Sequence, residues 1–129
     1  MKKKLMMLTC TAMLVGSVAW VPQADAAAWN KCKMCHNFTS KNKMGPGLAG
    51  VVGRKAGSKS DFHYTFVRYI KGDGWTWDEA HLRAFMCNST KAIRQFTNNP
   101  HARTAMPAQR VCDKKQQDEV LAKLKEVSK

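Results

Sequence analysis

The chain holds two cysteines and a histidine within five positions, in the order Cys32-Lys33-Met34-Cys35-His36. A thioredoxin-like dithiol needs such a pair at the start of a helix in a strand-helix-strand unit, and no alternating apolar strands flank this motif. A zinc site needs about four ligands, whereas the remaining cysteines of the chain are isolated. C-x-x-C-H is the attachment signal for a covalent haem, and the motif favours this third interpretation.

The spacing of the motif explains why it suits a haem. On a helix, Cys32 and Cys35 lie about one turn apart and project along one side, so that their sulfurs reach two edges of a porphyrin. His36 follows directly and points at the metal. The motif therefore predicts one haem c, attached through Cys32 and Cys35, with His36 as an axial ligand of its iron.

The second axial ligand decides what such a haem does. An open position would bind small gases or peroxide, whereas a thioether closes the position and favours electron transfer. Met34 lies inside the attachment loop, and Met86 falls on the apolar face of an expected helix, where a methionine is usually part of the core. Met106 stands in a proline-terminated stretch between helical segments, where its side chain can be presented across a cavity. The other candidates by residue type are Met44, His63, His81 and His101.

The first 26 residues have the pattern of an export signal. Three lysines precede an apolar run from Leu5 to Val21, and a small-x-small cleavage site ends at Ala26. Cleavage there leaves one domain, residues 27–129, in the periplasm, where disulfides can form. The run of 17 residues is also at the low edge of what spans a bilayer, so a retained membrane anchor is the alternative.

Several short stretches follow the attachment motif in a definite order: residues 45–50, residues 53–57, Tyr64, Gly74-Trp75-Thr76-Trp77 and Thr104-Ala105-Met106. In this order, from Trp29 to about Val127, the chain resembles the class I c-type cytochromes. The resemblance implies an all-α cytochrome c fold with helices wrapped around one haem. It also implies an electron carrier that is not an enzyme.

The family resemblance also implies roles for single residues. Pro46 would accept a hydrogen bond from the ring of His36 and so orient this ligand. Met106 would be the distal ligand of the iron. A buried haem propionate needs hydrogen-bond donors, and the resemblance implies Arg54, Tyr64 and Trp77.

Two departures from the family concern the helices. Only a few residues precede Cys32 after the predicted cleavage site, and Lys123 replaces an aromatic residue of the C-terminal helix. We therefore expect a reduced contact between the N-terminal and C-terminal helices, with Trp29 as a partial substitute.

A third departure is an insertion. The stretch from residue 86 to residue 106 is longer than in the family, which predicts an extra helix from Thr90 to Thr97, capped by Ser89.

Two cysteines bracket this insertion, Cys87 and Cys112. They form either a disulfide or two separate buried thiols, and an oxidising compartment favours the disulfide. Such a bridge would tie down the loop that carries Met106.

The remaining elements follow from capping and periodicity. The capping-box pattern Thr76-x-x-Glu79 predicts a helix that runs to about Met86. Asp113 should begin the last helix, whose apolar stripe contains Val120, Leu121, Leu124 and Val127. The glycine-rich stretch from 45 to 57 is expected to be a loop.

Charge suggests the kind of partner. Residues 27–129 contain 19 Lys and Arg against 8 Asp and Glu, a net charge of +11. This favours redox proteins with acidic docking surfaces, membrane-bound or periplasmic, over nucleic acid, with solubility alone as the alternative. We expect a monomer that meets the membrane only if its N-terminal segment is retained.

The sequence leaves two other functions open beside the electron carrier. A haem subunit or peroxidase-like domain would open its distal site, with His101 or Arg103 near the substrate. A sensor would exchange Met106 for a small ligand and move the inserted loop.

Overall fold

The computed structural model describes residues 26–129, and the predicted signal peptide, except Ala26, lies outside the described residues. Its helices are η1 (Ala28–Met34), η2 (Val67–Tyr69), α1 (Glu79–Cys87), α2 (Ser89–Phe96) and α3 (Lys114–Glu126). In this part of the chain the strand-like pairing is a single antiparallel bridge, between Lys55 and Thr76. The all-α fold expected from the sequence is confirmed. Among residues 26–129 no helix is both long enough and apolar enough to cross a membrane.

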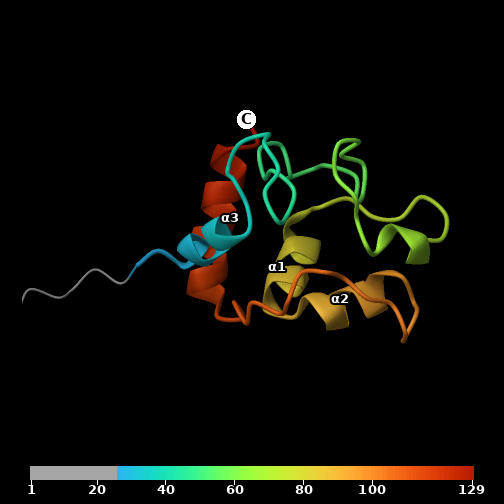
Figure 1. Cartoon of the computed structure of the whole chain (residues 1–129). Coiled ribbons are helices and arrows are strands. Elements are labelled where there is room, and N and C mark those ends of the chain that lie inside the picture. The colour runs from blue at the N-terminus through green and yellow to red at the C-terminus, as the bar shows by residue number, and fades with distance from the viewer. Residues whose placement is uncertain (1–25) are drawn as a thin grey trace, which may run out of the picture.

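The helices form one side of the molecule and loops form much of the other (Figure 1). α3 packs against both η1 and α1, and α1 packs against α2. The long connection between η1 and α1 carries the glycine-rich stretch, which is a loop as predicted. The attachment motif on η1 and the insertion that carries α2 are thereby held by the same α1–α3 framework.

The start of α1 differs from the prediction. The carboxylate of Asp78 accepts a hydrogen bond from the backbone N–H of His81 at 2.9 Å and caps the helix. The predicted Thr76 cap is wrong, because α1 begins at Glu79 and Asp78 directly precedes it, whereas Thr76 pairs with Lys55 in a backbone bridge. The end of the helix, at Cys87, agrees with the prediction to within one residue.

The inserted helix is present, and its cap also differs from the prediction. α2 begins at Ser89, and the side chain of Asn88 accepts from the backbone N–H of Lys91 at 2.9 Å. Asn88, not Ser89, is therefore the capping residue. The chain leaves the helix at Asn98, whose φ of 48° lies in the left-handed region that asparagine tolerates.

The last helix agrees with the sequence. Asp113 caps α3 by accepting from the backbone N–H of Gln116 at 3.1 Å. Three residues of the predicted stripe are buried, Val120, Leu121 and Leu124. The fourth, Val127, follows the helix and is half-buried.

An aromatic cluster fills the space between the loops and α1 and α2. Trp75 lies 5.5 Å from Phe66 and 5.6 Å from Trp77, measured between ring centroids. Phe85 and Phe96 extend the cluster onto α1 and α2. Met86 is buried in the same core, as the sequence predicted.

The N-terminal segment packs against α3 through η1, and Trp29 takes part in this contact. The ammonium of Lys123 lies 5.0 Å from the centroid of the Trp29 ring, and the ammonium of Lys33 lies 4.3 Å from it. The backbone N–H of Ala28 donates to the carboxylate of Glu119 at 3.1 Å. Trp29 therefore contacts α3 as expected, through a cation–π interaction with the lysine, whereas the expected reduction of the contact between the two terminal helices stays a prediction.

A disulfide joins Cys87 and Cys112, whose Cα atoms are 4.5 Å apart. It fixes residues 110–112 against the end of α1. The backbone N–H of Arg110 donates to Cys87 at 3.1 Å, and that of Val111 donates to Met86 at 3.2 Å. Of the two alternatives for these cysteines, the bridge is confirmed.

Candidate haem-binding site

The attachment motif forms the end of η1. The backbone N–H of His36 donates to the carbonyl of Cys32 at 2.8 Å, and that of Cys35 donates to the same carbonyl at 3.2 Å. Cys32 and Cys35 are therefore separated by one helical turn. Both thiols are half-buried and are not joined to each other. They are therefore available for two separate thioether bonds.

The ring of His36 is held in one orientation. Its Nδ1 lies 2.7 Å from the carbonyl oxygen of Pro46. A carbonyl can only accept, so Nδ1 carries the hydrogen and the lone pair is left on Nε2. A Cβ added to Gly45 would lie 2.6 Å from Nδ1 and 2.8 Å from Nε2, so the ring rests directly on the glycine backbone.

The pKa of His36 favours metal binding. Burial lowers the pKa of His36, and the hydrogen bond with the Pro46 carbonyl offsets part of this shift. The ring is therefore neutral near neutral pH, which is the form that binds iron. Burial raises the pKa of the neighbouring Cys32 thiol.

Two of the predicted propionate donors are brought together by backbone pairing. The N–H of Trp77 donates to the carbonyl of Arg54 at 2.9 Å, and the N–H of Gly53 donates back to Trp77 at 2.9 Å. The guanidinium of Arg54 makes two long hydrogen bonds, to the carbonyl of Gly47 at 3.3 Å and to that of Ala49 at 3.4 Å.

Tyr64 lies close enough to Arg54 for the charge of the guanidinium to affect the pKa of its hydroxyl. Burial raises the pKa of the Tyr64 hydroxyl, and the positive charge of Arg54 lowers it to a smaller extent. Tyr64 therefore lies in the same region as Arg54 and Trp77, within the long connection between η1 and α1, which we call the loop layer.

Met106 lies in a different part of the molecule, on the segment that follows α2. The hydroxyl of Ser89 donates to the Met106 carbonyl at 2.7 Å. The Met106 N–H donates to the hydroxyl of Thr104 at 3.3 Å. Its side chain is half-buried, unlike those of Met34 and Met44, which are 75% and 77% exposed.

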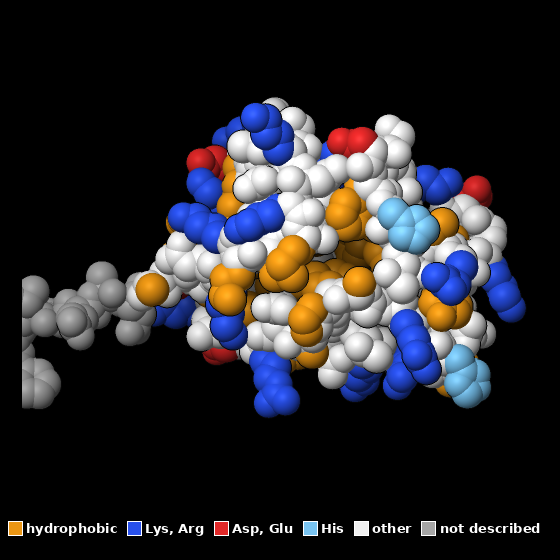
Figure 2. Space-filling model, viewed as in Figure 1, with side chains coloured by type: hydrophobic (Ala, Val, Ile, Leu, Met, Phe, Trp, Pro, Cys, Tyr) orange, Lys and Arg blue, Asp and Glu red, His pale blue; other side chains and the backbone are white. Residues whose placement is uncertain are grey.

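The residues present fit a haem. Figure 2 shows a hollow near the centre of one face, with hydrophobic side chains inside it and Lys and Arg around it. The described residues supply two free thiols on one turn and an oriented, neutral imidazole beside them. Such a donor set suits one covalently attached haem.

Two residues of this region were not predicted from the sequence. Gly45 matters because nothing larger fits against His36, and a glycine before Pro46 reads as an ordinary loop residue. Ser89 matters through its contact with Met106, and its position just before a helix suggested a cap. No local signal identifies either role.

Comparison with known proteins decides the family. The chain is 33% identical over 96 residues to cytochrome c2 of Cereibacter sphaeroides, which covers 66% of this chain and 77% of the relative. The chain belongs to the class I c-type cytochromes. It is also 37% identical over 95 residues to cytochrome c-554 of Methylosinus trichosporium, covering 67% of this chain and 70% of that protein. No family model matches the chain.

Solved structures agree with this membership. The cytochrome matches the X-ray structure of cytochrome c2 from Paracoccus denitrificans with a TM-score of 0.66 and 31% identity, over 78% of this chain and 89% of that one. The structure of cytochrome c2 from Rhodospirillum centenum matches with a TM-score of 0.67 and 26% identity, over 80% and 94% of the two chains. The protein is thus an electron carrier, not an enzyme, and carries one haem c through its cysteine pair.

Proposed function

We propose that the protein is a periplasmic one-electron carrier whose haem iron is bound by His36 and Met106. When bound, the haem supplies an iron that accepts and releases a single electron. The observation that best supports this ligation is the 2.7 Å hydrogen bond between His36 Nδ1 and the Pro46 carbonyl. It orients the ring with Nε2 free and strengthens the imidazole as a ligand.

The choice of Met106 rests on the surroundings of the other methionines. Met86 is buried in the core at 7% exposure. Met34 and Met44 are 75% and 77% exposed, next to Lys33 and Lys43, which are joined by a hydrogen bond at 2.8 Å. Met106 is half-buried on a separate segment, and its thioether would be the second ligand of the iron. Such a ligand closes the iron to small molecules and raises its potential relative to a second histidine.

Donors for the propionate come from the loop layer, as Arg54, Tyr64 and Trp77. A buried carboxylate without partners costs several kcal/mol, so it requires such donors. A guanidinium has five N–H groups, and the two long bonds of Arg54 leave others free.

The compartment is supported by two features of the chain. A disulfide persists in oxidising spaces such as the periplasm, and the Cys87–Cys112 bridge is of this kind. The export pattern in residues 1–26 provides the route.

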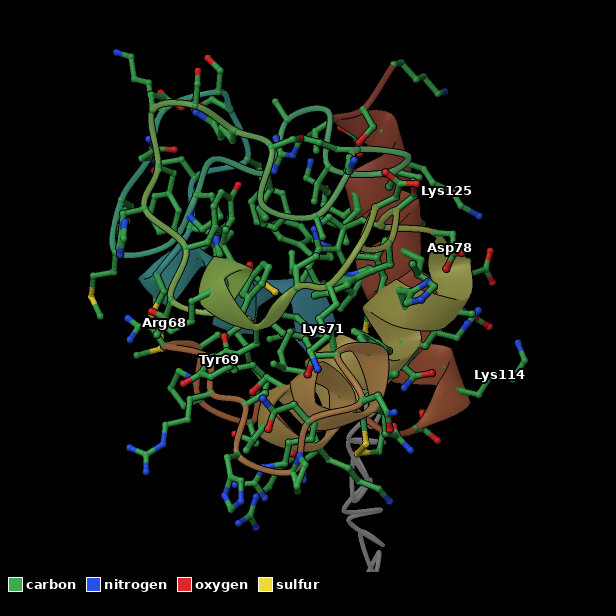
Figure 3. The ribbon with its side chains drawn as sticks, turned by 90° about the vertical axis from the view of Figure 1, so that its right-hand side faces the viewer. Arg68, Tyr69, Lys71, Asp78, Lys114 and Lys125 are labelled. Atoms are coloured by element: carbon green, nitrogen blue, oxygen red, sulfur yellow. A yellow bond between two sulfur atoms is a disulfide. The ribbon has the colours of Figure 1, made fainter. Side chains whose placement is uncertain are left out.

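The distribution of charge supports a docking surface for acidic redox partners. Residues 78–87 and 113–129, which hold α1 and α3, contain 6 Lys and Arg and 6 Asp and Glu. The rest of the described chain contains 13 Lys and Arg and 2 Asp and Glu, so all of the net charge lies outside these helices. Figure 3 shows Asp78 and Lys125 beside α1 and α3, while Arg68 lies on the opposite side of the view. Such an asymmetry orients the protein during encounter with an acidic surface.

The ligation is tested with the variant Met106→Ala and the matched control Met86→Leu. The oxidised wild type should show the far-red sulfur-to-iron charge-transfer band at neutral pH, and its reduced form should bind carbon monoxide poorly. Met106→Ala should lose the band and bind carbon monoxide readily, whereas Met86→Leu should keep both wild-type properties. A band that persists in Met106→Ala would contradict the assignment.

The docking surface is tested with Lys43→Gln and the control Lys115→Gln. Lys43 adjoins the attachment motif, and Lys115 is exposed on α3. The rate of electron transfer to an acidic redox protein at low salt should fall for Lys43→Gln and change little for Lys115→Gln. Electron-transfer rates that do not change with ionic strength in the wild type and in both variants would show that the charge serves solubility alone.

A further inference from the structure

Two hydroxyl groups hold the backbone of Met106 from both sides. The hydroxyl of Ser89 donates to its carbonyl at 2.7 Å, and the hydroxyl of Thr104 accepts from its N–H at 3.3 Å. Thr104 belongs to the same stretch of chain and is only two residues away. Ser89 is 17 residues away, on α2, and so connects Met106 to a different element.

Ser89 is a rigid point of attachment. Its side chain is fully buried, at 0% exposure, at the first position of α2. The helix itself is anchored by Ala92 and Ile93, at 1% and 0% exposure, and by its Asn88 cap. Because water does not reach this hydroxyl, Ser89 cannot exchange the Met106 carbonyl for a solvent partner, although Met106 itself is half-buried.

The other attachments of this segment lie away from Met106. Ala102 is fully buried before it, and Val111 pairs with the end of α1 after it. The ammonium of Lys31 donates to the Gln109 carbonyl at 3.0 Å, but this bond is exposed. The stretch between residues 102 and 111 is therefore fixed at its ends, and Ser89 supplies the buried side-chain contact at its middle.

We infer that Ser89 is a positioning residue that keeps Met106 in place as the axial ligand. The inference rests on the proposed ligation by His36 and Met106. In this proposal the methionine sulfur leaves the iron together with a movement of the Met106 backbone, and this movement breaks the bond with the buried Ser89 hydroxyl. Removing the hydroxyl leaves the carbonyl free to move and raises the population with Met106 displaced by about five- to tenfold.

The test uses imidazole as a competing ligand for the oxidised, haem-loaded protein. Imidazole binds only when Met106 has left the iron, so its affinity reports the displaced population. Ser89→Ala should bind imidazole about five- to tenfold more tightly than the wild type. Its far-red charge-transfer band should disappear at correspondingly lower imidazole concentration.

Thr97→Val is the matched control. Thr97 directly follows α2 and is also buried. Its hydroxyl donates to the Ile93 carbonyl at 2.6 Å, not to Met106. This variant should lose comparable stability and keep the imidazole affinity of the wild type within about twofold. An equal increase in both variants would show general destabilisation and would overturn the inference.

Different results would contradict the ligation by Met106 and the role of Ser89. A wild type without the far-red band would contradict the ligation by Met106 and with it the role of Ser89. A wild type that shows the band, together with an unchanged imidazole affinity in Ser89→Ala, would contradict the role of Ser89 alone.

Discussion

Removal of the Cys87–Cys112 disulfide should loosen the segment that carries Met106 before it unfolds the whole protein. The double variant Cys87→Ala/Cys112→Ala removes the bridge without leaving a thiol that could compete with the attachment cysteines. The two backbone hydrogen bonds beside the bridge, from Arg110 and Val111 to the end of α1, can still form. The perturbation therefore acts mainly on chain connectivity.

The size of the effect follows from the length of the closed loop. The two cysteines are separated by 25 positions in the sequence. In the chain-entropy model, a cross-link over such a loop reduces the entropy of the unfolded chain and stabilises the fold by about 3.5 kcal/mol. The loop includes α2 and Met106, so the same constraint also opposes local opening of the methionine segment.

Denaturant titration with two probes measures both effects. Far-ultraviolet circular dichroism reports global unfolding, and the far-red band reports the ligation by Met106. The variant should lose about 3.5 kcal/mol of unfolding free energy, with a larger dependence on denaturant because its unfolded state is more expanded. Its far-red band should disappear at a lower denaturant concentration than its helical signal, whereas the two transitions of the wild type lie closer together.

A loss of less than about 1 kcal/mol would refute the entropic reasoning, since it would be far below what a loop of this length predicts. Transitions that separate no further in the variant would refute the proposed link between the bridge and Met106. Reduction of the wild type offers an independent check, because Cys112 is exposed and accessible to a reductant.

Three further substitutions test local features of the structure. Gly45→Ala should displace the His36 ring and alter the haem spectrum. Gly50→Ala, whose Cβ would meet nothing within 4 Å but whose φ of 76° strains the backbone, should lower stability and leave the spectrum unchanged. Thermal unfolding should show that Asp78→Ala costs about 1 kcal/mol through loss of the α1 cap, while Thr76→Ala costs much less. Arg83→Gln should raise the acid-unfolding midpoint, because Arg83 helps to lower the pKa of Glu79 and Asp118. Because the pKa of each carboxylate is lower in the folded than in the unfolded protein, each one stabilises the fold at a pH above its unfolded-state pKa. This stabilisation is lost as the pH falls through the pKa of the folded state.

The residues that carry the chemistry were predictable because their signal is local. The attachment motif spans five positions, and one helical turn is enough to define the geometry of its sulfurs. The Asp113 cap and the stripe of α3 were predictable for the same reason, since both depend on contacts within one or two turns.

The errors at the other two caps have a common physical cause. Thr76 and Ser89 both have side chains suited to capping, and each lies where a distant part of the chain pairs with it, through the backbone for Thr76 and through the hydroxyl for Ser89. Thr76 pairs with Lys55 in the loop layer, and Ser89 donates to the Met106 carbonyl. In each case a nearby acidic or amide side chain, Asp78 or Asn88, caps the helix instead. Long-range partners of this kind leave no pattern in a single sequence.

The arrangement of the propionate donors was likewise beyond the sequence itself. Arg54 and Trp77 meet through two backbone hydrogen bonds across a long loop. Only the family resemblance suggested that these residues act together, and their role at the haem stays a prediction.

The central claim is a haem attached covalently through Cys32 and Cys35, and the mass of the intact protein under denaturing conditions tests it most directly. The account predicts a species carrying the mass of one haem that persists after unfolding. Replacement of both cysteines by alanine should abolish this added mass. A wild-type polypeptide that releases its haem on unfolding, or that never carried one, would contradict the account.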